Sequence, residues 1–297
     1  MQDKVDILLA TYNGAPFVAQ QLDSLLDQSH QNLRVIIRDD ASTDSTPQIL
    51  QEYATRFPSK IHILPSDNQL GVINNFSHLM KHATADYIMF CDQDDLWKSD
   101  KISQTLEKMQ EMETAFSKKS PLLVHTDLTV VDKNLNPIAT SFWKHSHINP
   151  KKRMTLNRLL IQNAVTGCTM MMNRPLLELA WPIPQDSVMH DWWIAIVASA
   201  FGQIDIVNNS TILYRQHGAN TVGAKKFWSI AYFRSVVKKL RQNDFKKTKQ
   251  AQEILERYSS LLQTDQLKLI RRYLKCYNAS FFKRLYIITL CIFFRKK

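Results

Sequence analysis

The stretch Tyr87-Ile-Met-Phe-Cys-Asp-Gln-Asp-Asp-Leu-Trp97 places a bulky, uncharged run directly before three carboxylates. Five such residues without helical spacing, Tyr87 to Cys91, are typical of a strand that is buried on both faces of a parallel sheet. The acids then follow the carboxyl end of that strand, where ligands bind in open α/β sheets. The alternation of side chains along the chain points Asp92 and Asp94 to the same side.

This acid cluster has two interpretations. Carboxylates that face one point repel each other, and a cation relieves the repulsion. Oxygen ligands favour Mg²⁺ or Mn²⁺ over zinc, and these ions commonly hold substrate phosphates as well. The sequence therefore predicts a metal and diphosphate site. The alternative is a polar turn that caps the helix after Trp97.

The residues before this stretch alternate between strand and helix patterns. These elements are expected at residues 5–10, 17–26, 35–37, 46–57, 61–64 and 72–80. Such alternation predicts a parallel sheet with right-handed crossovers. Polar turns end the strands at Thr11, Asp39 and Asp92, so that residues far apart in the sequence are expected to meet along one edge.

Length and composition fit one large α/β domain, or one domain with an appendage. The 297 residues are 44% hydrophobic, enough for a sizeable core. The four cysteines are widely spaced and suggest neither a zinc site nor a disulfide framework. No signal peptide is recognised, so a cytoplasmic location is expected. The net charge of +11 is uneven, with −4 over residues 1–224 and +15 over residues 225–297.

Four motifs together resemble the inverting family 2 glycosyltransferases with the GT-A fold. They are Ala10-Thr-Tyr-Asn-Gly14, Asp39-Asp-Ala-Ser-Thr-Asp44, Asn68-Gln-Leu-Gly71 and Asp92-Gln-Asp-Asp95. They cover roughly the first third of the chain, and further matches continue to about Gly223. The resemblance implies an α/β, Rossmann-like nucleotide-sugar-binding fold with a mostly parallel central sheet. Ala41 stands where the family usually has glycine.

The resemblance also implies roles for residues along the edge. The nucleotide-sugar contacts that it implies are Thr11, Tyr12, Asn13, Asp40, Asn68, Asp92 and Gln93. Asp40 is expected at the base, because a carboxylate accepts the N3 proton of uracil or thymine. Asp94 and His217 are expected to hold a divalent metal, Mn²⁺ or Mg²⁺.

The second half of the chain is expected to bind the acceptor. Residues 122–131 read as strands, 154–161 as a helix and 163–172 as an extended segment. Inverting transfer requires a base that takes the proton of the attacking hydroxyl. In the motif Met189-His-Asp-Trp-Trp193, Asp191 fits that role and matches the position of the family's base. The alternative is a helix-capping Asp191 followed by two core tryptophans.

Three aromatic residues, Trp97, Trp192 and Trp193, are expected to stack on acceptor sugars. His217 ends the motif Tyr214-Arg-Gln-His217, and the loop 218–223 after it is expected to close over the donor.

The expected organisation is a GT-A domain at 1–224, with a nucleotide-binding half at 1–100 and an acceptor half at 101–224, followed by a helical basic extension at 225–297. Leu285 to Phe294 is uncharged, too short to span a bilayer and flanked by cations. An interfacial membrane contact is therefore expected. Nucleic-acid binding and an ordinary helical cap or dimer contact are the alternatives.

Together these features predict a metal-dependent inverting glycosyltransferase. The combination of the three motifs that contain Asp94, Asp191 and His217 is most similar to bacterial rhamnosyltransferases, which implies dTDP-L-rhamnose as donor and a lipid-linked surface polysaccharide as acceptor. Another UDP- or dTDP-sugar, such as glucose or galactose, is an alternative donor. A nucleotidyltransferase and a basic, non-catalytic nucleotide- or nucleic-acid-binding protein are the other classes considered. A homodimer is also expected.

Overall fold

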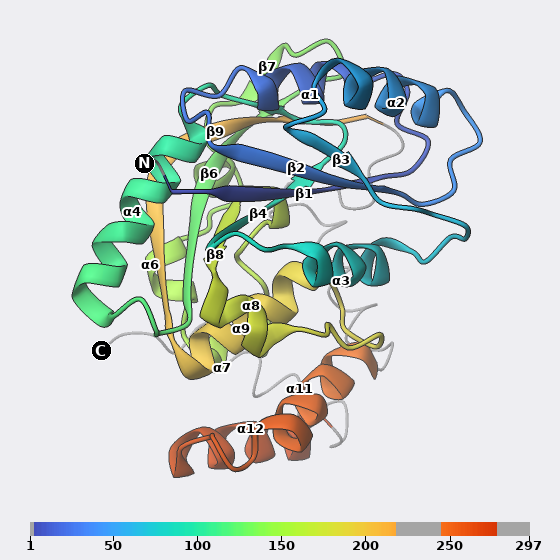
Figure 1. Ribbon diagram of the computed structural model, residues 1–297. Coiled ribbons are helices and arrows are strands. Elements are labelled where there is room, and N and C mark those ends of the chain that lie inside the picture. The colour runs from blue at the N-terminus through green and yellow to red at the C-terminus, as the bar shows by residue number, and fades with distance from the viewer. Residues whose placement is uncertain (1–2, 218–244, 278–297) are drawn as a thin grey trace.

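The computed structural model describes residues 3–217 and 245–277. Strands and helices alternate through the first hundred residues, as the sequence predicts (Figure 1). The elements of this half are β1 (Val5–Thr11), α1 (Val18–Leu26), β2 (Leu33–Asp39), α2 (Thr46–Arg56), β3 (Ile61–Ile63), α3 (Val72–His82), β4 (Tyr87–Asp92) and β5 (Leu96–Trp97). The predicted buried strand at Tyr87–Cys91 is confirmed, and all five of these residues are at most 2% exposed.

The second half mixes longer strands with short helices. Its elements are α4 (Lys101–Phe116), β6 (Leu122–Val131), β7 (Pro137–Ala139), α5 (Phe142–His145), α6 (Pro150–Arg153), α7 (Leu156–Leu159), the 3₁₀ turn η1 (Gly167–Thr169), β8 (Met170–Asn173), α8 (Arg174–Ala180), α9 (His190–Phe201), β9 (Gln203–Arg215), α11 (Phe245–Tyr258) and α12 (Thr264–Tyr277). The segment expected to be extended, residues 163–172, is interrupted by η1.

One sheet joins the two halves, in the order β3-β2-β1-β4-β8-β6-β9-β5, with β7 paired to β6. The first four strands are mutually parallel, and β6 is parallel to β9. Strand β8 is antiparallel to both β4 and β6, and so links the two parallel blocks. The sheet is therefore mostly parallel, as expected.

Each face of the sheet has its own hydrophobic core. Leu9, Leu22 and Met109 belong to the core that α1, α2 and α4 cover. Phe76 and Trp193 belong to the core on the other face, which is covered by α3, α8 and α9. Because helices cover both faces, the carboxyl ends of β1, β2 and β4 are left as the edge at which polar loops gather.

The described part of the predicted extension packs directly on the second core (Figure 1). Ile254 of α11 and Ile270 of α12 are fully buried there. The Tyr258 hydroxyl donates to the carbonyl of Leu179, and Gln266 Nε2 donates to the carbonyl of Ala200 at 2.6 Å. The boundary predicted at residue 224 therefore does not separate residues 245–277 from the core of the domain.

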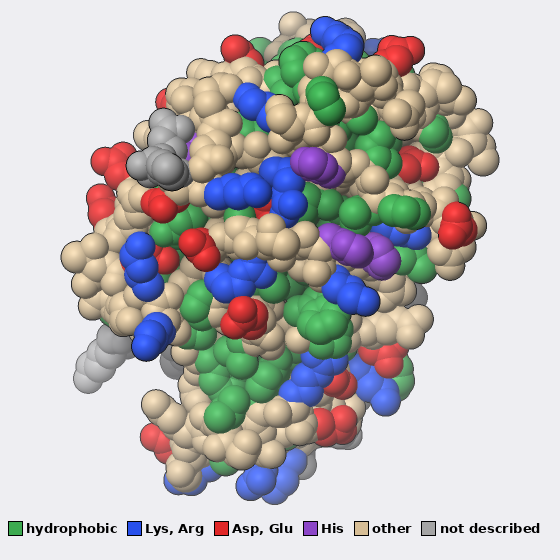
Figure 2. All heavy atoms as spheres, viewed as in Figure 1, with side chains coloured by type: hydrophobic (Ala, Val, Ile, Leu, Met, Phe, Trp, Pro, Cys, Tyr) green, Lys and Arg blue, Asp and Glu red, His purple; other side chains and the backbone are tan. Residues whose placement is uncertain are grey.

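The predicted lid, residues 218–223, and the predicted interfacial run, Leu285 to Phe294, lie outside the described residues. Within the described residues, no helix combines the length and the apolar character needed to cross a bilayer. Lys and Arg side chains are spread over the face shown in Figure 2, from the sheet to the helices at the bottom.

Candidate active site

Three strand ends lie side by side at the edge predicted from the sequence. In the parallel register Ala10 faces Asp92 of β4, and Thr11 faces Asp39 of β2. The loops that follow β1, β2 and β4 therefore start from neighbouring points. This is the convergence that the sequence predicts.

Gln93 joins the loop after β4 to the loop after β1. Its Oε1 accepts from the N–H of Tyr12 at 2.8 Å, and its Nε2 donates to the Tyr12 carbonyl at 2.9 Å. A Cβ at Gly14 would lie 2.2 Å from Gln93 Oε1, so this contact requires glycine. Tyr12 itself is 45% exposed and remains accessible to a ligand.

Thr11 has a structural position. Its side chain is 1% exposed, and its hydroxyl donates to Asp39 Oδ1 at 2.8 Å. The contact of Thr11 with the nucleotide sugar stays a prediction, and the Thr11 side chain itself is held by Asp39. Asn13 is exposed, and its Oδ1 accepts from the N–H of Thr43 at 2.8 Å, which ties the first loop to the second.

Asp40 anchors the loop at residues 68–71. Its two oxygens accept from the N–H groups of Leu70 and Gly71 at 2.7 and 2.8 Å. Arg38 contacts Asp40 Oδ1 at 2.8 Å and also donates to the Asn68 carbonyl. The contact of Asp40 with the nucleotide base stays a prediction, as does that of the exposed Asn68.

The acids after β4 lie in one another's electric field. Burial raises the pKa of Asp92 to about 7, and the charges of Asp94 and Asp191 add to this effect. Burial and the charges of Asp94 and Asp92 raise the pKa of Asp95 well above its usual range. Two neighbouring carboxylates whose ionised forms are this unfavourable are suited to a cation.

Asp94 and His217 are 123 residues apart in the sequence and lie side by side in the structure. Asp94 Oδ2 lies 2.7 Å from His217 Nε2, and both side chains are about one-seventh exposed, at 15% and 14%. Arg215 braces this pair, because its Nε donates to the Asp94 carbonyl at 2.9 Å. The expected grouping of Asp94 with His217 is therefore present in the structure.

A second group lies deeper. The ligand atoms of Asp92, Asp95 and Cys168 are all within 4.8 Å of one another. Burial raises the pKa of the Cys168 thiol well above its usual range, with Asp95 and Asp92 contributing. A protonated thiol is a poor ligand for a hard cation. Asp94 and His217, which are partly exposed, are therefore the better ligands for Mn²⁺ or Mg²⁺.

Asp191 lies at the start of α9, on the far side of the acid cluster from the first loop. Its Oδ2 accepts from the N–H of Gly167 at 3.1 Å, and its Oδ1 has no hydrogen-bond partner among the described residues. Burial raises the pKa of this carboxyl to about 7, although the N–H groups of Trp192 and Gly167 oppose the shift. A carboxylate with a free oxygen and a pKa near neutrality is suited to accept a proton.

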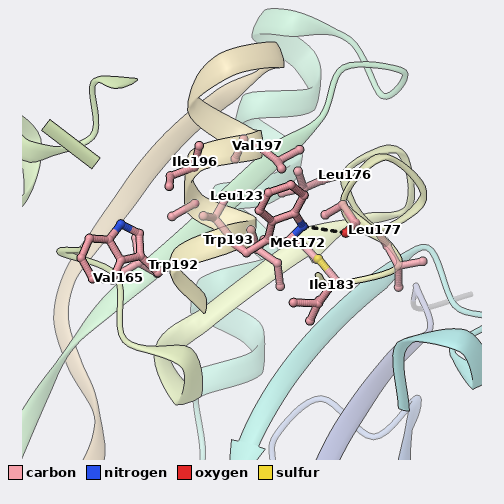
Figure 3. Close-up of a cluster of buried hydrophobic side chains, with 14 of the residues drawn as sticks. Leu123, Val165, Met172, Leu176, Leu177, Ile183, Trp192, Trp193, Ile196 and Val197 are labelled. Atoms are coloured by element: carbon pink, nitrogen blue, oxygen red, sulfur yellow. Dashed lines mark hydrogen bonds between the residues drawn. The ribbon is translucent and has the colours of Figure 1, made fainter. Parts of the chain in front are cut away.

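The three tryptophans expected to contact the acceptor are buried in the hydrophobic cores, at most 9% exposed. Trp193 is 0% exposed and its indole N–H donates to the Ala180 carbonyl, whereas that of Trp192 donates to the Leu159 carbonyl. Figure 3 shows both indoles among aliphatic side chains. Trp97 is 4% exposed, and the Lys101 ammonium lies 4.5 Å from its ring centre. None of the three has a free face for a sugar ring.

Gly167, Lys101 and Phe17 belong to this site, although the sequence motifs did not single them out. Gly167 had one available signal, since the chain has only six glycines and each is a candidate for a close approach. A Cβ at Gly167 would lie 2.6 Å from His190 Nε2. Lys101 and Phe17 take their importance from contacts over long sequence distances, which no local pattern shows.

Comparison with known proteins agrees with this geometry. The model of the family described as Glycosyl transferase family 2 matches residues 6–179. This chain belongs to glycosyl transferase family 2. The dTDP-rhamnosyl transferase RfbG of Shigella flexneri is 31% identical, over 76% of this chain and 77% of its own length. The putative teichuronic acid biosynthesis glycosyltransferase TuaG of Bacillus subtilis is 32% identical, over 57% of this chain and 62% of its own length.

Solved structures show that this family 2 chain has the GT-A fold. The structure of residues 1–349 of S. aureus TarS has a TM-score of 0.60 at 17% identity, covering 98% of this chain and 75% of that one. The mannosyltransferase PcManGT of Pyrobaculum calidifontis, in complex with GDP-Man and Mn²⁺, has a TM-score of 0.55 at 16% identity, covering 98% of this chain and 80% of that one. The glycosyltransferase therefore combines this fold with the acid edge described above.

Replacing Gly167 by alanine should displace the anchor of Asp191. The added Cβ would meet His190 Nε2 at 2.6 Å and lie 3.6 Å from Asp191 Cβ, so the backbone N–H moves away from Oδ2. We expect at least a roughly tenfold loss of kcat with donor-nucleotide affinity retained, because a misplaced base costs rate. Steady-state kinetics and a nucleotide-binding titration measure the two effects. Thr166→Ala, next in the chain, is the control, and equal kinetics of the two variants would contradict the anchor.

Proposed function

We propose that this family 2 enzyme is a metal-dependent, inverting rhamnosyltransferase. It takes L-rhamnose from dTDP-L-rhamnose and adds it to a lipid-linked bacterial surface polysaccharide. The observation that carries the reaction type is the Asp191 carboxylate, whose buried Oδ1 has no hydrogen-bond partner among the described residues and which lies in the field of the acid cluster after β4. The similarity to a relative named as a dTDP-rhamnosyl transferase supports the choice of donor.

The donor set at the edge fits a hard divalent cation. Asp94 and His217 would hold the ion, with the Asp92 carboxylate next to them, because burial and repulsion leave these acids in need of positive charge. When bound, the metal supplies positive charge that stabilises the departing diphosphate. Cys168 is left out of this set, because its thiol stays protonated.

The protein's own residues provide the proton transfer. The acceptor hydroxyl donates its proton to Asp191 Oδ1 as the hydroxyl oxygen attacks the anomeric carbon, and the bond from that carbon to the diphosphate breaks on the opposite face. Gly167 holds Oδ2 and so aims Oδ1. Tyr12 and Asn13 are exposed on the loop after β1 and are proposed to contact the donor. Gln93 fixes this loop in place through its hydrogen bond with Tyr12.

Two rival classes predicted from the sequence lose support. A nucleotidyltransferase and a non-catalytic nucleic-acid-binding protein both leave Asp191 without a role. In this chain Asp191 accepts from the backbone N–H of Gly167. The family 2 model separately matches residues 6–179, which end before Asp191. A homodimer stays a prediction, and gel filtration with light scattering tests it.

Asp191→Asn should abolish transfer without damaging the fold. We expect a loss of kcat of at least about 10² to 10⁴-fold, the usual contribution of a general base. Because the folded protein favours protonated Asp191, its stabilising share is lost as the pH rises through about 7, and the asparagine variant should melt no lower than wild type at pH 8. Wild-type kcat/KM should rise with pH up to about 7 and then level off.

The control for Asp191→Asn is Asp186→Asn, an exposed acid in the loop before α9. It should keep wild-type kinetics and the same pH profile. Transfer by Asp191→Asn at the wild-type rate would reject the base assignment.

A panel of nucleotide sugars tests the donor. With dTDP-L-rhamnose, UDP-glucose, UDP-galactose and dTDP-glucose assayed under identical conditions, we expect the highest kcat/KM for dTDP-L-rhamnose. Discrimination on sugar substituents alone is expected to be only about 10 to 200-fold, because small apolar differences carry little binding energy. Turnover of UDP-glucose but not of dTDP-L-rhamnose would reject the rhamnosyl part and leave the glycosyltransferase intact.

A lipid-linked acceptor implies work at the inner membrane surface. We propose that residues 281–297, which contain five cations around an uncharged run, contact anionic lipid there. Flotation of the full chain and of a chain ending at residue 280 on vesicles that contain phosphatidylglycerol tests this contact. Equal flotation of the two chains would contradict it.

A further inference from the structure

Phe17 lies where the first loop meets the metal end of the site, and the reaction described above gives it no role. It precedes α1, and its N–H donates to the carbonyl of Gly14 at 2.9 Å. Its ring is half-buried. The ring therefore belongs to the loop after β1. The side chain of Gln93 packs against Gly14 of the same loop.

Two side chains from the end of β9 contact this ring. The imidazole of His217 lies 4.7 Å from the Phe17 ring, measured between ring centres, with an angle of 31° between the planes. The Arg215 guanidinium carbon lies 4.9 Å from the centre of the same ring. A ring that contacts both groups restricts the rotamers of each.

The same two side chains hold Asp94. His217 Nε2 lies 2.7 Å from Asp94 Oδ2, and Arg215 Nε donates to the Asp94 carbonyl at 2.9 Å. Gln20 lies about one turn beyond Phe17, and its Oε1 accepts from Arg215 Nη2 at 2.8 Å. This bond is a second link between α1 and β9. One aromatic ring therefore connects the first loop with both groups that fix the predicted metal ligand.

We propose that Phe17 is a positioning residue that sets His217 and Arg215 against Asp94 and so pre-organises the metal end of the site. The inference rests on the proposed metal dependence. It assigns to Phe17 no contact with the donor or the acceptor. Without the ring, His217 gains rotamers that point away from Asp94, and the ion has to order them again when it binds.

Ring removal should therefore appear as weaker metal binding. For Phe17→Ala and Phe17→Leu we expect Mn²⁺ affinity to fall roughly tenfold, a loss of the size that cation–π and ring contacts provide. Phe17→Tyr keeps the ring and should stay within about twofold of wild type on the same grounds. Electron paramagnetic resonance of free Mn²⁺ measures the affinity without any need for turnover.

Kinetics give a second readout that a purely structural role would not change. The Mn²⁺ concentration for half-maximal rate should rise in Phe17→Ala, whereas kcat at saturating Mn²⁺ returns close to wild type. Phe57→Ala is the matched control, because its half-buried ring lies over Arg56 and contacts neither His217 nor Asp94 in the described structure. It should leave Mn²⁺ affinity unchanged.

The outcomes separate this inference from the function on which it rests. If wild-type enzyme binds Mn²⁺ and Phe17→Ala binds it equally well, the role of Phe17 is wrong and the proposed function stands. If Phe17→Tyr is as weak as Phe17→Ala, the ring is not the cause and the role is again wrong. If wild-type enzyme transfers sugar without binding or needing a metal, the metal dependence fails, and the inference fails with it.

Discussion

Repulsion among the carboxylates that follow β4 is the constraint on which the rest of this site depends. Burial and neighbouring charges raise the pKa of Asp92 to about 7 and that of Asp95 well above its usual range. The three acids are supported in different ways. Asp94 is held by His217, Asp95 Oδ1 accepts from the Arg215 N–H at 3.2 Å, and a hydrogen bond from Cys168 lowers the pKa of Asp92 against the stronger effect of burial.

The inner side of the cluster has a cation of its own. Lys101 is fully buried, and burial lowers its pKa to about 8 while Cys168, Cys91 and Asp95 oppose the shift. A lysine with this pKa is mostly charged at neutral pH, and the Trp97 ring lies against its ammonium group. Trp97 thus stabilises a buried charge instead of stacking on a sugar. Since Lys101 already places positive charge near Asp95, the proposed metal is needed at Asp94 and His217.

The strand at Tyr87–Asp92 could be predicted from its apolar run, and the grouping of Asp94 with His217 from the family resemblance of their motifs. The burial of Thr11 was also within reach, since alternation along β1 places it on the face of Ile7 and Leu9, which are both fully buried. The burial of the three tryptophans could not be predicted in the same way. Helix α9 is apolar on nearly all sides, so its sequence does not show which face meets a ligand. The contacts of Gly167 and Phe17 join segments far apart in the chain, and their spacing carries no signal.

The hydrogen bond from the Gly167 N–H shows how Asp191, the proposed base, is oriented while its pKa stays raised. At Asp6, burial would raise the pKa, but Arg34 at 2.7 Å and the N–H groups of Thr84 and Ala85 outweigh it, so that carboxylate stays charged and is a weak base. Among residues 3–217 and 245–277, no cation lowers the pKa of Asp191. Its neighbour His190 is packed against two phenylalanine rings, and burial lowers the pKa of this imidazole to about 3, so it stays neutral.

A guanidinium or an imidazolium beside Asp191 would fix its geometry, but it would also lower the pKa and remove most of its basicity. The N–H of Gly167 is a small neutral dipole, and it holds Oδ2 while the pKa remains near 7. Glycine allows this approach because a Cβ at that position would run into His190. The neutral histidine, the bare backbone and the uncompensated carboxylate therefore depend on one another, and each is required for a base that can accept a proton at neutral pH.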